Sequence, residues 1–352
     1  MKKRFSNFEL LRIIAMVMIV GSHCLTSTDA VNMVPGGMFS SVLLASMQTV
    51  VTYGVNLFAL ITGYFMVSRT SVSVQKIVKL LLDVALYGVI MYGSSILVGI
   101  NEFSIGGLIK AALPLLAGYR WFVLAYCVLY LISPLINAAL RHISKKQYLV
   151  FLGLYAFFFS IWPTFLPYPP LDDYGYSFHH LIFIYLIVGY IRLHVTDVKL
   201  SWCAGALAAA FAITTSLFFL DGISIPLLNS AVGYRTANNS VFVVIASVSL
   251  FLMFTKVKLQ SNAINTLASS AFAVYLLHGD YNMMDYLFNE VFHVGALYSW
   301  PIWFLAYPLY MAAIYIFFAL VDLAKQKLLD KPLNLILSKI KFLNFKITAM
   351  EE

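Results

Sequence analysis

The sequence contains few charged residues. Only 11% of its 352 residues are Asp, Glu, Lys or Arg, and only 15 are acidic, whereas an ordinary soluble domain carries about 25% charged residues. Hydrophobic residues make up 61% of the chain. This composition excludes an ordinary soluble protein and predicts that a lipid bilayer surrounds most of the chain.

Cysteine is also scarce. The three cysteines, Cys24, Cys127 and Cys203, lie inside apolar stretches and form no CxxC pair, which argues against a disulfide framework or a zinc site. His179 and His180 are adjacent, so on a helix their side chains point about 100° apart and make a poor metal-binding pair. We therefore expect no metal site.

The chain lacks polar linkers, low-complexity tracts and soluble repeats. Apolar runs of about 20 residues, the length that crosses a bilayer as a helix, recur instead. We predict an all-α fold, a polytopic transmembrane helical bundle with about ten spans. The predicted spans are 9–26, 41–67, 77–99, 121–139, 147–166, 179–193, 200–220, 240–255, 266–289 and 300–323. We expect a single transmembrane domain of residues 1–352, with spans from about 9 to 323, a cytoplasmic basic tail at 324–352 and no C-terminal soluble domain.

The basic residues fall mainly on one side of the predicted spans. An even number of spans places both termini on that side. It holds 19 basic residues: Lys2, Lys3, Arg4, Arg69, Lys76, Lys79, Arg141, Lys145, Lys146, Arg192, Lys199, Lys256, Lys258 and the six lysines from Lys325 to Lys346. Only Lys110, Arg120 and Arg235 lie opposite. The positive-inside rule thus predicts a multi-pass protein of the cell membrane with cytoplasmic termini. The net charge of +8 then reflects topology and contact with membrane lipid rather than nucleic-acid binding.

The first predicted span contains three ionisable residues, Glu9, Arg12 and His23, in the segment FELLRIIAMVMIVGSHC. Ionisable residues inside a span are costly and are candidates for function. Eleven residues of helix return to within about 20° of the starting direction and rise about 16 Å, so Arg12 and His23 share one face. We predict a polar track with Arg12 near the cytoplasmic leaflet and His23 near the outer mouth. Two alternatives stay open: Arg12 as a snorkelling anchor paired with Glu9, and His23 as a structural polar residue.

Two further ionisable groups lie inside predicted spans. Asp83, in LLLDVALYG, must be paired or protonated there, and Arg12 or Arg69 is its expected partner. A purely structural ion pair is an equally acceptable interpretation of Asp83. His278 and Asp280 lie in the ninth predicted span. We regard Asp83 and His278 as supporting residues of a site.

Four segments together resemble the acyltransferase 3 family of membrane proteins, which includes bacterial O-antigen, exopolysaccharide and peptidoglycan O-acetyltransferases. FELLRIIAMVMIVGSH contains Arg12 and His23 at the family's Arg-x10-His spacing, and LFALITGYFM is followed by Arg69. WFVLAYCVLYLISPLIN resembles the family's Trp-aromatic start and Leu-Tyr-Leu-x-x-Pro-x-x-Asn close. SSAFAVYLLH resembles its late histidine element, with Ala273 where glycine is common. The chain departs from some relatives by lacking Arg-x-x-Arg in a cytoplasmic loop.

The resemblance implies an acyltransferase that takes an acyl group from cytoplasmic acyl-CoA, with acetyl-CoA as the expected donor. The implied acceptor is a hydroxyl of an extracytoplasmic polysaccharide or of its lipid-linked precursor. The expected roles are His23 as catalytic base and Arg12 and Arg69 as donor-binding residues, since arginine suits phosphates and the ordinary pKa of histidine lies near neutral. The alternative is a carrier or flippase for lipid-linked saccharides, although the sequence shows neither the inverted repeats nor the paired broken helices of many transporters.

Overall fold

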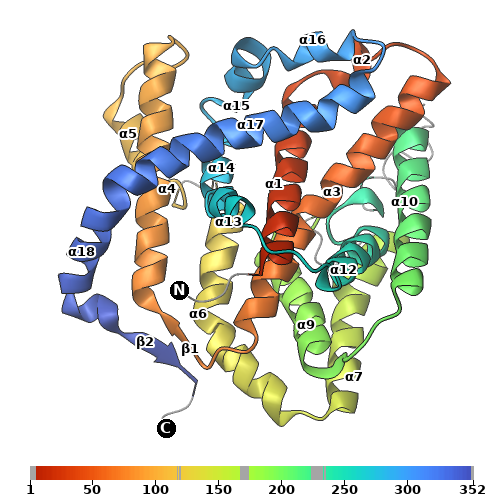
Figure 1. Cartoon of the computed structure of the whole chain (residues 1–352), viewed down its shortest axis with the longest axis vertical. Coiled ribbons are helices and arrows are strands. Elements are labelled where there is room, and N and C mark those ends of the chain that lie inside the picture. The colour runs from red at the N-terminus through yellow and green to blue at the C-terminus, as the bar shows by residue number, and fades with distance from the viewer. Residues whose placement is uncertain are drawn as a thin grey trace.

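The computed structural model describes residues 5–116, 118, 120–166, 174–222, 233 and 235–349, and these residues form a helical bundle (Figure 1). The predicted fold class is therefore confirmed. Lys2, Lys3 and Arg4, and parts of the predicted outer loops at 167–178 and 221–239, lie outside the described residues.

Seven helical runs in the described part of the chain are long and apolar enough to cross a bilayer. They are α1 (Ser6–Ser27), α3 (Met38–Met66), α4 (Val74–Leu97), α6 (Trp121–His142), α10 (Leu200–Gly222), α17 (Trp303–Lys325), and the continuous run of α7 (Lys145–Ala156), η1 (Phe157–Ile161) and α8 (Trp162–Phe165). Two shorter apolar helices are α9 (Phe178–His194) and α12 (Val241–Thr255). The protein is therefore a multi-pass membrane protein.

The ninth predicted span, 266–289, is broken into short pieces. They are α13 (Asn262–Ala268), α14 (Ala271–His278), α15 (Met284–Tyr286) and the π-helix η2 (Leu287–Val291). Serine stands at the first break in the helix. The Ser269 hydroxyl donates to the Thr266 carbonyl at 2.7 Å, and such a bond competes with helical hydrogen bonding. The count of ten spans consequently stays a prediction. A second break, at Gly279, ends α14 at His278, inside the bundle.

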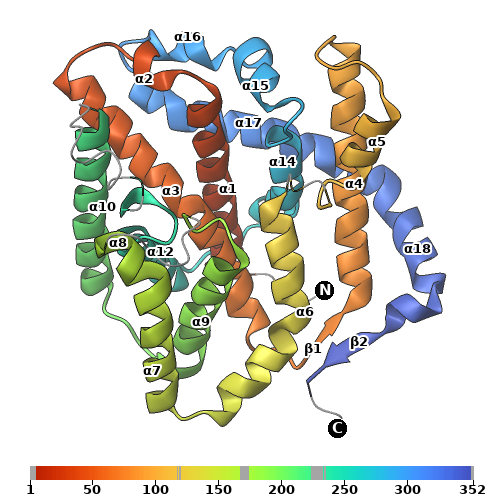
Figure 2. The same ribbon diagram turned by 180° about the vertical axis from the view of Figure 1, so that it is seen from behind.

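The helix α1 lies at the centre of the bundle, between α3 and α14, in both views (Figures 1 and 2). Its approach to α3 depends on Gly54, because a Cβ atom at that position would lie only 2.8 Å from the Ala15 carbonyl oxygen. Small residues allow such close approach between helices in membranes. Arg12 and His23, the two residues of α1 predicted to be functional, therefore lie on a helix that packs against protein on several sides.

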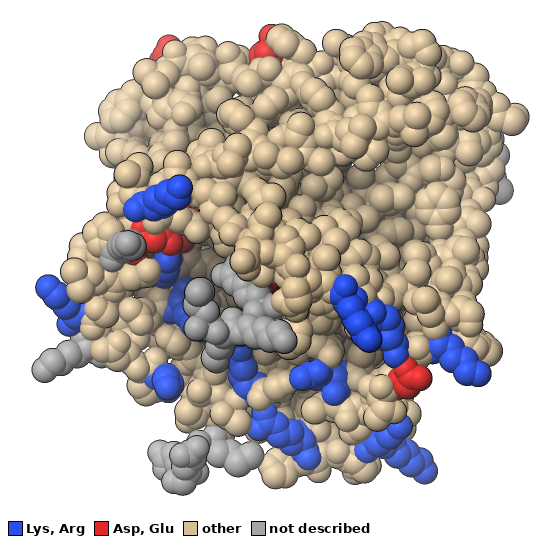
Figure 3. Space-filling view, viewed as in Figure 1, with Lys and Arg blue, Asp and Glu red and all other residues tan. Residues whose placement is uncertain are grey.

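Short helices cover the end of the bundle opposite the chain termini (Figure 1). They are α2 (Ala30–Met33) and α16 (Val294–Tyr298), whereas α5 (Ile105–Ala112) packs beside α4. Lys and Arg side chains gather mainly in the lower half of Figure 3, where Figure 1 places both termini. This distribution matches the predicted partition of basic residues, whereas the side of the membrane that each end faces stays a prediction.

The segment after α17 is folded against the bundle. It forms the π-helix η3 (Gln326–Asp330), α18 (Lys331–Lys339), the 3-10 helix η4 (Lys341–Asn344) and β2 (Lys346–Thr348). The strand β2 pairs antiparallel with β1 (Ser71–Ser73), with Val72 opposite Ile347. The predicted basic tail thus contacts the loop that follows α3.

Candidate functional site

Two histidines meet where α1 and α14 pack together. The Nδ1 atom of His23 lies 3.0 Å from the Nε2 atom of His278, and His278 is completely buried. The Nδ1 atom of His278 lies 2.6 Å from the Val274 carbonyl oxygen. Since a carbonyl only accepts, Nδ1 of His278 carries hydrogen and its Nε2 accepts from Nδ1–H of a neutral His23. This arrangement leaves the Nε2 atom of His23 with its lone pair, as a proton acceptor requires.

The two rings can meet because a glycine follows His278. A Cβ atom on Gly279 would lie 3.0 Å from Cε1 and 3.1 Å from Nδ1 of His23, which is too close for an unperturbed ring. Tyr275 borders the pair, with its ring centroid 6.3 Å from that of His23. Both histidines were predicted as candidate site residues, whereas Gly279 was not. Only its position directly after His278 indicated a role in the sequence.

Arg120, at the start of α6, holds the end of α14. Its NH2 group donates to the Leu276 carbonyl at 2.9 Å and to Oδ2 of Asp280 at 2.8 Å, and its NH1 group donates to the Gly279 carbonyl at 3.3 Å. The C-terminal carbonyls of a helix carry partial negative charge and favour a cation there. Arg120 therefore fixes the end of the helix that carries His278. The predicted topology also places this arginine at the outer ends of the spans.

His23 borders a cavity of about 260 Å³. Hydroxyls of Ser22 and Thr26 and the rings of Trp121 and Tyr176 also line it. The two rings pack edge to face with centroids 5.3 Å apart. The cavity thus combines a proton acceptor with hydroxyl and aromatic groups, a combination that orients a polar organic ligand.

A second cavity, of about 490 Å³, lies along the same helix toward its N-terminus. Its charged lining residues are Glu9, Arg12, Arg69, Lys76, Lys79 and Asp83. The structure therefore brings together Arg12 and Arg69, the two predicted donor-binding residues. With four basic and two acidic side chains, the lining is positive and suits an anionic ligand.

Some of these charges are already paired. Arg12 forms an ion pair with Glu9 one turn earlier, and Lys79 pairs with Asp330 at 2.8 Å. Among the residues that the structure describes, no carboxylate forms an ion pair with Arg69. The exposed Arg69 side chain is therefore available to an anion in the cavity.

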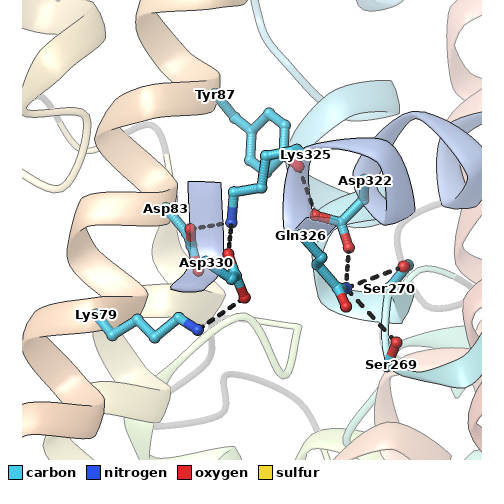
Figure 4. Close-up of polar contacts among 9 residues, drawn as sticks. All are labelled: Lys79, Asp83, Tyr87, Ser269, Ser270, Asp322, Lys325, Gln326 and Asp330. Atoms are coloured by element: carbon cyan, nitrogen blue, oxygen red, sulfur yellow. Dashed lines mark hydrogen bonds and ion pairs between the residues drawn. The ribbon is translucent and has the colours of Figure 1, made fainter. Parts of the chain in front are cut away.

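Asp83 pairs with Lys325, not with Arg12 or Arg69, so the predicted partner was wrong (Figure 4). The sequence analysis assigned Lys325 to the terminal tail, but α17 continues to this residue and brings its side chain to α4. Lys325 also contacts Asp330 at 3.1 Å. Asp83, which lines the cationic cavity, is thus paired with a lysine at the end of α17 that does not line it.

A second chain of polar contacts lies beside these charges (Figure 4). The Tyr87 hydroxyl donates to Oδ1 of Asp322 at 2.5 Å. The Gln326 amide donates to Oδ2 of Asp322 at 2.6 Å and to the Ser270 hydroxyl at 3.3 Å. These bonds join α4 and α17 to the start of α14, so the helix with His278 is held at both ends.

Asn137 of α6 positions the backbone at Arg69. Its amide donates to the carbonyls of Met66 and Arg69 at 3.0 and 2.9 Å, and its oxygen accepts from the Tyr185 hydroxyl at 2.7 Å. Met66 is the last residue of α3, and its carbonyl also accepts from the Arg69 backbone N–H at 2.9 Å. Side-chain donors commonly satisfy carbonyls at helix ends. Asn137 is the last residue of the LISPLIN segment, and no individual role was predicted for it.

The described residues contain no group of three or more His, Cys, Asp or Glu side chains that could hold a metal ion. His180 bonds instead to Asn56, with Nε2 lying 2.6 Å from Oδ1. The three cysteines are buried and unpaired with one another.

Comparison with known families connects these cavities to an activity. A family model described as an acyltransferase domain, Acyl_transf_3, matches residues 5–322, nearly the whole chain. No curated protein and no solved structure matches the sequence. The match includes both histidines and every charged residue that lines the second cavity. This multi-pass membrane protein therefore belongs to the Acyl_transf_3 family and is an acyltransferase.

Proposed function

We propose that the protein transfers an acyl group, with acetyl as the expected group, from cytoplasmic acyl-CoA to a hydroxyl of an extracytoplasmic glycan. The acceptor is a polysaccharide or its lipid-linked precursor. One observation carries the proposal: α1 borders a cationic cavity at Arg12 and a second cavity at His23. Donor and acceptor thus have separate sites along one helix.

The cationic cavity binds the phosphates of acyl-CoA in this proposal. Arg12 and Arg69 are the main ligands because guanidinium groups form paired hydrogen bonds with phosphate oxygens. Lys76 and Lys79 add positive charge to the same lining. The excess of basic residues on the terminal half supports a cytoplasmic position for this cavity, where acyl-CoA is found.

His23 acts as general base on the acceptor. Its Nε2 atom takes the proton of the acceptor hydroxyl while the hydroxyl oxygen attacks the thioester carbonyl carbon. The new oxygen–carbon bond forms, the carbon–sulfur bond breaks, and the proton passes from His23 to the departing thiolate sulfur. His278 supports this step because its Nε2 atom accepts from Nδ1 of His23 at 3.0 Å. That bond maintains the required tautomer and stabilises the imidazolium, as in other base–orienter pairs.

The acceptor occupies the cavity at His23. The hydroxyls of Ser22 and Thr26 offer hydrogen bonds, and Trp121 and Tyr176 offer ring faces and edges. Several polar groups around an apolar cavity fix the orientation of a bound ligand. A sugar ring, with hydroxyls around an apolar body, matches this lining.

Transfer is tested in inverted membrane vesicles that contain the protein and its surface glycan. We expect radioactivity from acetyl-CoA labelled in the acetyl group to enter the glycan, and we expect vesicles from a deletion strain to incorporate none. Equal incorporation in both would overturn the proposal. A deletion strain whose surface lacks the glycan altogether, with no labelling in the complemented strain, would instead identify a carrier of lipid-linked saccharide.

A further inference from the structure

Three phenylalanines line both cavities. They are Phe58 of α3, Phe122 of α6 and Phe272 of α14. The rings of Phe58 and Phe122 pack edge to face with centroids 5.9 Å apart. Because each ring borders both spaces, the three side chains form the boundary between the cationic cavity and the cavity at His23.

The boundary is largely buried and continues to the histidine pair. Phe58 and Phe122 are only 8% and 9% exposed. Tyr275 lies behind the boundary, with ring centroids 6.1 Å from Phe122 and 6.2 Å from Phe272. The same tyrosine borders His23. An apolar constriction of this kind excludes water and ions, so the polar track predicted on α1 is interrupted between Arg12 and His23.

The reaction proposed above requires the donor to cross this boundary. Arg12 and His23 are eleven residues apart on α1, a rise of about 16 Å. A donor whose phosphates bind at Arg12 and Arg69 must therefore extend its thioester past the rings to reach His23. The acyl group passes the rings first, because it is the free end of the bound donor.

We propose that Phe58, Phe122 and Phe272 form an aromatic partition that the acyl end of the donor passes, and that their rings limit the size of the transferred acyl group. The inference rests on the proposed acyl transfer. Transfer of a short acyl group displaces the rings least, whereas each added methylene requires more space between the buried Phe58 and Phe122 and the partly buried Phe272. The partition also separates the aqueous spaces of the two cavities when no donor is bound.

Acyl preference tests the role in specificity. Vesicles are supplied with equal concentrations of acetyl-, butyryl- and hexanoyl-CoA, and the glycan-bound acyl groups are measured by mass spectrometry. We expect Phe58→Ala, Phe122→Ala and Phe272→Ala to raise the hexanoyl-to-acetyl ratio about tenfold, the discrimination that a few methylenes provide in an apolar site. Phe251→Ala is the matched control, because Phe251 is buried but lines neither cavity. An unchanged ratio in all three variants, or an equal rise in the control, would refute the specificity role.

Thiol labelling tests the partition without any acyl transfer. Thr26→Cys places a thiol in the cavity at His23 in a protein whose Cys24, Cys127 and Cys203 are replaced by alanine. An impermeant thiol reagent should label it from the outer face only, and the additional Phe122→Ala change should allow labelling from the cytoplasmic face. Labelling from both faces with all three rings present would refute the partition, even if acetyl transfer occurs. A one-sided pattern in a protein that transfers no acyl group would count against the proposed function alone.

Discussion

Arg120 and Asp280 form an ion pair at 2.8 Å in which each side chain is only 2% exposed. Asp280 also accepts from the Asn282 backbone at 3.0 Å, so its carboxylate is satisfied from both sides. A buried pair of this kind is favourable only when both partners make further hydrogen bonds. Both do, and together they fix the turn that follows His278.

Arg120→Met should leave Asp280 buried and unpaired and release the carbonyls of Leu276 and Gly279. Loss of one partner of a buried pair costs about 3–5 kcal/mol, so we expect a lower thermal midpoint. Arg120→Lys keeps the positive charge but loses the forked N–H donors of the guanidinium group. It should lower kcat about 100-fold while leaving the KM for acyl-CoA unchanged. A folded Arg120→Lys protein with normal kcat would show that α14 holds His278 without this contact.

His23→Ala should reduce glycan acylation by about 100- to 10,000-fold, the usual contribution of a positioned general base. His23→Gln should be similarly inactive, because glutamine forms hydrogen bonds but does not accept a proton usefully at neutral pH. The measurement is acyl content of the surface glycan in a deletion strain complemented at matched expression. Near-normal acylation with His23→Gln would rule out the base assignment.

Arg12→Ala and Arg69→Ala should each weaken acyl-CoA binding about tenfold or more, since a charge-assisted hydrogen bond contributes about 1.5–3 kcal/mol. The larger effect is expected at Arg69, which has no carboxylate ion-pair partner in the described part of the chain. Calorimetry on detergent-purified protein gives the Kd. Lys145→Ala is the control, because this exposed lysine begins α7 and lines neither cavity. Unchanged affinity in both arginine variants would remove them from the donor site.

Lys325→Met should destabilise the protein by about 2–3 kcal/mol, because it leaves Asp83 and Asp330 without their shared cation. The double change Asp83→Leu and Lys325→Met should be less destabilising than Lys325→Met alone, since no carboxylate then remains at position 83. Thermal unfolding in detergent measures both. The exposed Lys327→Met is the control and should have little effect. Equal midpoints for Lys325→Met and Lys327→Met would show that the pair contributes nothing.

The orientation of the bundle is tested with single-cysteine variants that lack the three native cysteines. We expect a thiol at Tyr176, within the predicted outer loop, to react with an impermeant reagent in intact cells. A thiol at Lys145 should react only after the membrane is opened, because the basic residues mark the cytoplasmic side. The reverse pattern would invert the topology.

Much of the bundle was predictable from the lengths of the apolar runs and from the ionisable residues inside them, which are costly in a bilayer. Nine of the predicted spans have a matching helix or helical run among the described residues. The shared face of Arg12 and His23 followed from helix geometry alone. His278 was named because an ionisable group in an apolar segment is costly in a bilayer and therefore indicates a function.

The pairing of residues distant in the sequence was not predictable. Periodicity describes one helix at a time, so it shows that Asp83 needs a partner but not that Lys325 is that partner. The break before α14 was missed because Ser269 and Ser270 lie within an otherwise continuous apolar run. Phe58 and Phe122 resemble any other apolar side chain in sequence, and only the packing of three helices places them between two cavities.

The strand pair between β1 and β2 sets an order for biosynthesis. Synthesis proceeds from the N-terminus, so the loop that follows Arg69 leaves the ribosome long before Lys346, Ile347 and Thr348. The helices of the bundle are therefore synthesised before the backbone partner of this loop exists. Ser71–Ser73, which begins two residues after Arg69, therefore stays an unpaired strand in the nascent membrane protein until β2 is made.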